Sequence, residues 1–236
     1  YDSDAVYNRG AVIVSTMMNY MGREVFLPAM RQYFQQYAYQ TANSQLLCDA
    51  LTQYSGTDMQ GFFDSYVYSS GMPHLYASIK DVNEVDNRFE VKLDLHYQHI
   101  GDDHVGQDNA YEVTFIGPDF QLCTRRVHWD GQHAEISGFL DFEPVGLVND
   151  FYNGWLDGRT QKNFMLKSSV QQSLGNLKIE ATAFTDSVFV AIENHLVGPY
   201  DDPLIPNLTL STQHFWTVNR HDFGAAEVMG MFDFTN

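Results

Sequence analysis

The chain has 236 residues, of which 44% are hydrophobic and 18% are charged. That hydrophobic fraction is enough for folded cores, and the length suits one large domain or two to three small ones. The 13 basic and 30 acidic residues give a net charge of −17. A field of that sign repels phosphate backbones, so we expect no nucleic-acid partner. Because no apolar run is long enough for a bilayer, we also expect no membrane span.

Residues 1–73 are predicted to be helical, because apolar residues recur there at the spacing of one helix face. The three stretches are Gly10, Val14, Met17, Met18 and Met21; Phe26, Met30, Tyr33, Phe34 and Tyr37; and Leu47, Ala50, Leu51 and Tyr54. Asn43 and Ser44 stand where the third helix should begin. Thr57 and Gln60 form a capping-box pattern that predicts a fourth helix. Gly71 and Pro73 should end the helical segment.

After Pro73 the period changes from 3.6 to 2. Apolar and polar residues alternate over residues 89–97, which predicts a half-buried strand. Strands and turns at this spacing predict an antiparallel β-sandwich of immunoglobulin or fibronectin type over residues 74–148. Residues 149–163 are rich in Asn, Asp and Gly and are expected to be a linker or a crossing segment. Residues 149–236 should form this linker and a second β-rich region, so the expected fold class is α+β and multidomain.

No complete catalytic motif is present. The chain lacks the zinc-protease pattern H-E-x-x-H, the hydrolase elbow G-x-S-x-G and the Walker A sequence. His96 and His99 lie three apart on a predicted strand, so they should face opposite ways and cannot share a metal; both are interpreted as surface residues. The acidic stretch at residues 101–109 suits a solvated loop better than a calcium site. Cys48 and Cys123 are predicted to be buried thiols.

The helical segment resembles one known family. It contains Tyr7-Asn8-Arg9-Gly10-Ala11, followed by Gly22, Phe26, Tyr33 and Tyr39, and it closes with Asp58, Phe62, Phe63, Tyr66, Gly71 and Pro73. This order is similar to the C-terminal portion of the catalytic domain in M1-family (gluzincin) zinc aminopeptidases. Tyr66 stands where the family usually has Trp. The resemblance implies that residues 1–73 are the helical end of such a domain.

The resemblance also implies a division of the active site. In the family, the zinc ligands and the catalytic Glu come from H-E-x-x-H and a later Glu, which precede the Tyr element. The parent would therefore hold zinc and hydrolyse N-terminal residues from peptides, whereas this chain alone would bind no zinc and be inactive. Tyr7 is the one catalytic residue that carries over, as a hydroxyl that donates to the oxyanion of the tetrahedral intermediate. No metal ligand is assigned.

Further expectations follow for neighbouring residues. Gly10 should be a close-packing position between helices, and Arg9 should pair with an acid or be a structural or solvated charge. The missing N-terminal half of the catalytic domain would be a partner of residues 1–73. Without it, an apolar face that includes Met17, Met18 and Met21 should be exposed, and the chain should tend to self-associate.

An alternative function stays open. The parent could be a non-catalytic M1-like scaffold whose β modules bind a protein or a polysaccharide, as the Tyr66 departure and the extra β region suggest. The stretches "VAIENHLVGPYDDP" and "LSTQHFWTVN" look similar to exported M1-like peptidases of Bacteroidetes. That likeness favours a periplasmic, cell-surface or extracellular location in a bacterium.

Overall fold

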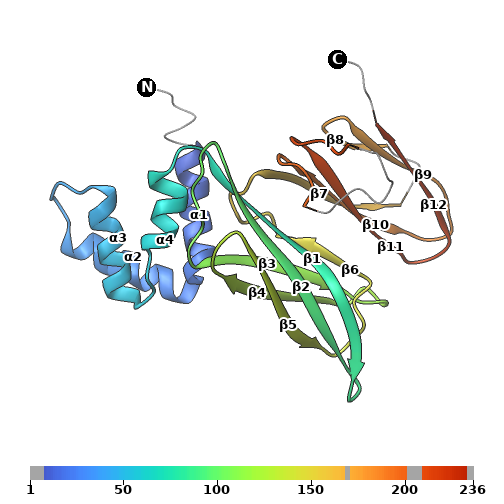
Figure 1. The fold of residues 1–236 in the computed structure, drawn as a ribbon, viewed down its shortest axis with the longest axis horizontal. Helices are drawn as coiled ribbons and strands as arrows, with labels where there is room; N and C mark the ends of the chain where they lie inside the picture. Colours follow the sequence, from blue (N-terminus) through green and yellow to red (C-terminus); the bar gives the residue numbers. More distant parts are fainter. Residues whose placement is uncertain (1–7, 168–170, 201–208, 233–236) are drawn as a thin grey trace.

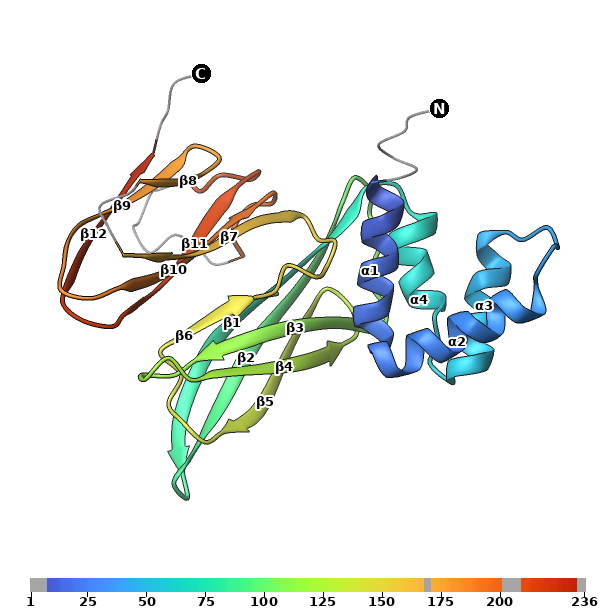
Figure 2. The same cartoon turned by 180° about the vertical axis from the view of Figure 1, so that it is seen from behind.

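The structure is a computed structural model that describes residues 8–167, 171–200 and 209–232. Within these residues it contains four short α-helices and twelve strands in antiparallel sheets, which confirms the α+β class. The helices gather at one end of an elongated molecule, and a long hairpin projects from its middle (Figure 1). A second group of strands forms the other end, as the view from behind also shows (Figure 2).

The helical segment follows the predicted order. Its elements are α1 (Gly10–Met21), α2 (Arg23–Gln36), α3 (Ser44–Ser55), α4 (Gln60–Phe63) and the π-helical η2 (Asp64–Tyr68). Asn43 caps α3 as its position suggested, because its side chain accepts a hydrogen bond from the backbone N of Leu46 at 2.8 Å. The capping box at Thr57 is wrong. Asp58 instead accepts from the backbone N of Gln60 at 3.0 Å, while the backbone N of Thr57 donates to Ser55.

The cap at Asn43 gives a first prediction. Replacing Asn43 by alanine should lower the free energy of unfolding by about 1 kcal/mol, because the amide of Leu46 loses its acceptor. Urea unfolding followed by circular dichroism would measure the change. Ser44→Ala, one residue further along, is the matched control and should change stability little. Equal losses in the two variants would contradict the capping role.

Two three-stranded sheets make up the first β region. One has the order β1-β2-β5 and the other the order β4-β3-β6. Their strands are β1 (Met72–Val85), β2 (Arg88–Ile100), β3 (Asn109–Ile116), β4 (Leu122–Trp129), β5 (His133–Leu140) and β6 (Gly146–Asn149). The alternation predicted over residues 89–97 is confirmed, since Val91, Leu93, Leu95 and Tyr97 are buried on one face of β2.

The helical segment and this first β region share one hydrophobic cluster. Met17 and Tyr20 of α1 and Phe62 of α4 belong to the same cluster as Leu75 of β1 and Tyr111 of β3. Helices and sheets therefore pack as one body. The two sheets both contribute to this core, and the immunoglobulin-like or fibronectin-like sandwich stays a prediction.

The second β region has a core of its own. Its sheets have the orders β11-β10-β7 and β12-β9-β8. The strands are β7 (Arg159–Leu166), β8 (Gln172–Leu174), β9 (Leu177–Phe184), β10 (Val188–His195), β11 (Phe215–Asp222) and β12 (Ala226–Phe232). Their cluster contains Leu166, Leu177, Ile179, Ala181, Val188, Val190 and Ile192.

The predicted linker at residues 149–163 is partly wrong. Its last five residues belong to β7, which pairs with β10 from Arg159 opposite His195 to Leu166 opposite Val188. Composition suggested a loop because polar residues dominate there. The strand forms because those polar groups are satisfied by a partner distant in sequence.

Three expectations about single residues are also corrected. Met17 and Met21 are buried, at 3% and 6% exposure, because they face the sheets; the apolar residues exposed on the helices include Val12, Val14, Leu27 and Phe34. A Cβ at Gly10 would meet no described atom within 4 Å, so none of the described helices packs closely against Gly10.

The expectation that both cysteines are buried holds for only one of them. Cys48 is buried but Cys123 is only half-buried, and both are free thiols. Self-association stays a prediction. Among the described helices, none has both the length and the apolar character that a membrane crossing requires.

Candidate functional site

The sequence predicts a catalytic residue, Tyr7, just before α1. Tyr7 lies outside the described residues. Two residues later, a guanidinium nitrogen (Nη2) of Arg9 donates a hydrogen bond to the backbone carbonyl of Gly71, which closes the helical segment. Arg9 therefore joins the start of the helical segment to its end. Of the three roles expected for Arg9, this is the structural one.

Three polar contacts hold the rest of α1 against two loops, the one before β3 and the one between β6 and β7. Thr16 accepts a hydrogen bond from the backbone N of Leu156 at 2.8 Å, and Asn19 donates to the carbonyl of Gly154 at 2.7 Å. The hydroxyl of Tyr20 donates to the carboxylate of Asp108 at 2.8 Å. These contacts, together with that of Arg9, hold α1 at both of its ends.

A serine, a histidine and an aspartate meet where the helical segment joins β2. His99 Nδ1 lies 2.8 Å from Asp102 Oδ1, and His99 Nε2 lies 3.0 Å from Ser69 Oγ. The order resembles a nucleophilic triad, but Ser69 donates its proton to the carbonyl of Ser65 at 2.6 Å. Its hydroxyl is thus engaged in closing the helix, and the side chain of His99 is fully buried. The arrangement is a structural junction.

The acidic loop that follows β2 is also explained by internal contacts. Asp102 accepts hydrogen bonds from the backbone N of His104 at 2.9 Å and of Ser70 at 3.1 Å. The bond from His104 is the main reason that the pKa of Asp102 lies below its usual value. Together with the bond from Tyr20 to Asp108, these contacts show that two of the carboxylates of this loop accept hydrogen bonds from the protein.

A second histidine cluster lies on the opposite face of β2. His96 and His99 point to opposite faces as predicted, but His99 is buried and the surface interpretation is wrong for it. His96 lies opposite His133 in the pairing of β2 with β5, and Asp94 lies two residues before His96 on the same face. The carboxylate of Asp94 contacts Nε2 of His96 at 3.0 Å and Nε2 of His133 at 2.6 Å.

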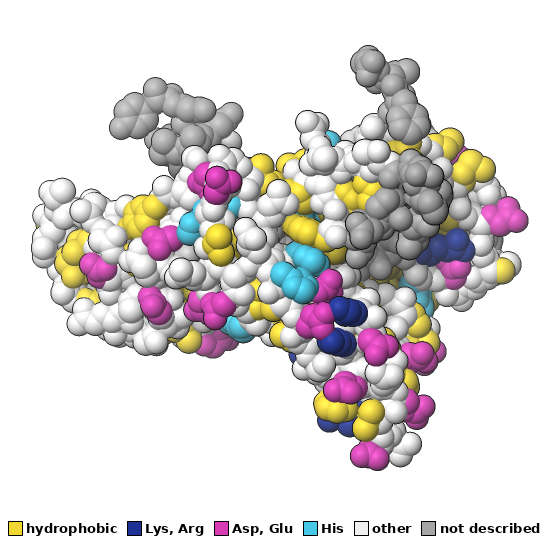
Figure 3. Space-filling model, in the orientation of Figure 1, with side chains coloured by type: hydrophobic (Ala, Val, Ile, Leu, Met, Phe, Trp, Pro, Cys, Tyr) yellow, Lys and Arg dark blue, Asp and Glu magenta, His cyan; other side chains and the backbone are white. Residues whose placement is uncertain are grey.

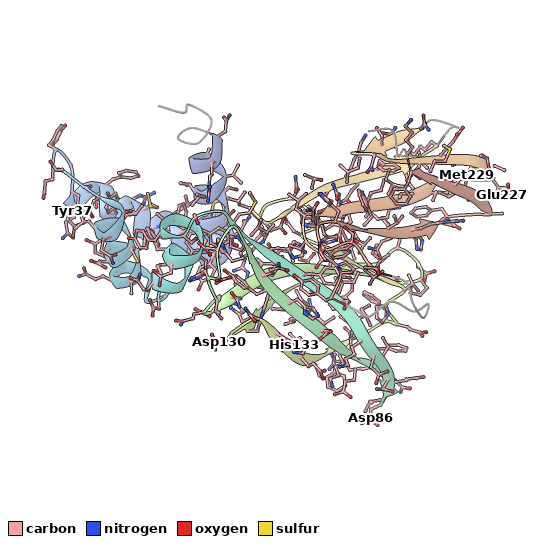
Figure 4. The ribbon with its side chains drawn as sticks, turned by 45° about the horizontal axis from the view of Figure 1, so that its top comes forward. Tyr37, Asp86, Asp130, His133, Glu227 and Met229 are labelled. Atoms are coloured by element: carbon pink, nitrogen blue, oxygen red, sulfur yellow. The ribbon has the colours of Figure 1, made fainter. Side chains whose placement is uncertain are left out.

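This cluster sits among charged side chains at the middle of the molecule. Figure 3 shows histidines beside acidic and basic groups there, and Figure 4 places His133 near the hairpin of β1 and β2. Partial burial acts to raise the pKa of Asp94, yet the hydrogen bonds from His133 and His96 hold it below its usual range. No local pattern in the sequence predicts the cluster, because His133 joins it only through the pairing of β5 with β2.

A buried charge network connects the two β regions. Arg159 of β7 contacts Asp157 at 3.2 Å, Glu193 of β10 at 3.0 Å and Asp150 at 3.5 Å, and its side chain is 1% exposed. Burial raises the pKa of Asp150 to about 7, and it raises the pKa of Asp157 as well. Burial is also the largest influence on Glu193 and acts to raise its pKa, but Arg159, His195 and Thr217 together hold the pKa of Glu193 below its usual range.

Comparison with known proteins bears on the helical segment. Residues 1–66 match the Peptidase family M1 domain. The chain is 28% identical over 81 residues to aminopeptidase N of Lactococcus lactis subsp. lactis, a match that covers 34% of this chain and 10% of that protein. It is 33% identical over 79 residues to aminopeptidase M1 of Arabidopsis thaliana, covering 33% and 9%.

The chain spans about a tenth of the length of these curated relatives. The matches nevertheless agree with the Tyr-x-Arg-Gly-Ala element at residues 7–11 and with the packing of the helices behind it. Together they support an M1-family aminopeptidase-like protein.

Proposed function

We propose that this chain forms the C-terminal part of a zinc-dependent aminopeptidase that hydrolyses N-terminal residues from peptides. The observation that carries the proposal is the match of residues 1–66 to the M1 peptidase domain. The contacts of α1 support it, since they hold the helix that begins just after Tyr7 in one orientation. A tyrosine at that position suits an oxyanion donor, because a phenol is stiff and stays neutral near pH 7.

The zinc of the family does not fit residues of this chain. The sequence contains no H-E-x-x-H, and the cluster of Asp94, His96 and His133 lies on a β-sheet without a glutamate base of that pattern. The proposal therefore places the zinc ligands in a segment that precedes these residues in the complete protein. On this proposal the 236 residues alone do not hydrolyse peptides, and the preceding segment packs against the helices.

The alternative is a scaffold whose β regions bind a protein or a polysaccharide. Its support is the second β region, which has a hydrophobic core separate from that of the peptidase-like part. Tyr66 gives it no support, because this ring is 6% exposed and stacks on Phe62 with ring centroids 4.6 Å apart. An aromatic residue other than Trp thus fills the core at that position.

Tyr7→Phe in the complete protein tests the proposed function. Loss of one oxyanion donor should lower kcat for an amino-acid p-nitroanilide by about 100-fold to 1000-fold, while zinc content measured by mass spectrometry stays unchanged. Tyr39→Phe is the matched control, because Tyr39 is fully exposed. The 236-residue chain alone should give no turnover.

Two results would overturn the assignment. A complete protein that holds zinc at the H-E-x-x-H site of the preceding segment but does not cleave the substrate would favour the scaffold. Unchanged kcat in the Tyr7→Phe variant would remove Tyr7 from the catalytic residues.

A further inference from the structure

We propose that Asp94, His96 and His133 bind one divalent transition-metal ion, with Zn²⁺ as the best match. One ligand atom of each residue can be chosen so that all three lie within 4.8 Å of one another. Two imidazole nitrogens and one carboxylate oxygen are a donor set that suits Zn²⁺. Calcium and magnesium prefer sites made of oxygen atoms, so they fit this set less well.

The backbone brings these ligands together without help from a loop. Asp94 and His96 lie two residues apart on β2, so both side chains leave the same face of the sheet. His133 lies directly opposite His96 on β5, and cross-strand partners have Cβ atoms about 5 Å apart. In a tetrahedral zinc site, neighbouring ligand atoms are about 3.4 Å apart. The present contacts of 3.0 Å and 2.6 Å with Asp94 need only small side-chain movements to reach that spacing.

Neighbouring groups leave the three side chains available. Glu135, two residues after His133, is paired with Lys80 and Lys92, so neither lysine forms a salt bridge with Asp94. The ring of Tyr200 stacks on His96 with centroids 4.1 Å apart. The Tyr200 hydroxyl is hydrogen-bonded to His74 at 2.8 Å, so Tyr200 orients His96 and is not itself a ligand.

A pocket beside the cluster supplies room for a fourth ligand. It has a volume of about 440 Å³ and is lined by His96, His133, Tyr200 and residues of the loop after β2. Three protein ligands with one open position are typical of zinc sites that bind water or an exchangeable ligand. The site would thus hold zinc with one coordination position facing this pocket. It is independent of the aminopeptidase proposal, because none of its residues lies in the segment that matches the peptidase domain.

Metal titration of the purified, metal-free 236-residue chain tests the site. Isothermal titration with ZnCl₂ should show one ion bound per chain, and His133→Ala should weaken that binding at least about 10-fold. His133 is exposed, so this variant should fold normally, which a melting curve checks. His128→Ala is the matched control, because His128 is also an exposed strand histidine.

Cobalt distinguishes this cluster from the two free thiols. Co²⁺ at the proposed site should give the visible absorption of tetrahedral nitrogen and oxygen ligands without a thiolate charge-transfer band. Absence of saturable binding would overturn the proposal, as would equal binding by His133→Ala and the unchanged chain. A thiolate band that persists in His133→Ala would assign the ion to a cysteine instead.

Discussion

Arg159→Met is expected to lower the free energy of unfolding by about 3–5 kcal/mol. Arg159 is the cation of a network that contains Asp150, Asp157 and Glu193, and the side chains of all four are at most 3% exposed. Removing one partner of a buried ion pair leaves the other charge unpaired in a poorly solvated place, which is the costly case. Methionine fills similar volume, so the loss should reflect charge more than packing.

Further contacts of the same guanidinium add to the expected effect. Arg159 Nη1 donates to the backbone carbonyl of Asn149 at 2.6 Å and to the side chain of Gln161 at 2.8 Å. The hydroxyl of Tyr111, from β3, donates to Asp157 at 2.6 Å. The network thus joins strands of both β regions. Its loss should remove the ion pairs and also weaken the contact between the two regions.

Urea unfolding at two pH values would measure the change. Without Arg159 the buried carboxyl groups should have raised pKa values in the folded state. A carboxyl whose folded pKa exceeds its unfolded pKa loses stability as pH rises from about 4 toward the folded pKa. The deficit of Arg159→Met relative to the unchanged chain should therefore be smaller at pH 5 than at pH 8.

Arg220→Met is the matched control for this prediction. Arg220 is a strand arginine that pairs with Asp222, but its side chain is 37% exposed. An exposed pair contributes up to about 1 kcal/mol, so the control should lose little. Similar losses in the two variants, or a deficit that does not change with pH, would contradict the role of the buried charges.

Gly71→Ala should lower the free energy of unfolding by about 4 kcal/mol or more. Gly71 has φ of +88°, a region that residues with a Cβ avoid, and an added Cβ would lie 1.7 Å from the carbonyl oxygen of Ile100. The obstacle is backbone, so no side-chain rotation relieves it. The junction between the helical segment and β2 would have to open, and Arg9 would lose its acceptor.

Gly131→Ala separates the cost of the positive φ from the cost of the clash with Ile100. Gly131 has φ of +78°, but an added Cβ there would meet nothing within 4 Å. This control should show the backbone cost alone, about 1–2 kcal/mol. Thermal unfolding of both variants would measure the difference. If Gly71→Ala lost no more than Gly131→Ala, the close approach to Ile100 would not limit stability.

Local signals in the sequence were enough for several elements, although not for the start of β7 or the cap of α4, and they were not enough for the clusters. The alternation over residues 89–97 predicted β2, and Asn43 predicted the start of α3, because both depend on neighbours within a few residues. His133 reaches Asp94 only through the register of β2 and β5, which no local pattern reveals. Arg159 looked like part of a polar linker, because its partner Glu193 lies on another strand.

The same limit explains the error about the methionines. Periodicity correctly placed Met17 and Met21 on one apolar face of α1, but it does not say what covers that face. The core shared with the first β region covers Met17 and Met21, whereas Val14 of the same predicted face and Phe34 of α2 are left exposed. For Tyr7 the functional role stays a prediction that only the activity of its variant can test.

The hydrophobic cluster shared by the helices and the first β region limits how this architecture can be rearranged. Recombination between related genes can exchange a part only if each half keeps a closed core. A crossover after residue 73 would separate Tyr20 and Phe62 from Leu75 and Tyr111, and it would leave two apolar faces open to water. The helices and their sheets should therefore be inherited together. The second β region has a core of its own, but Phe189 and Ala191 of β10 also pack with Ile116 and Val148 of the first region, so its loss would expose a smaller apolar surface as well.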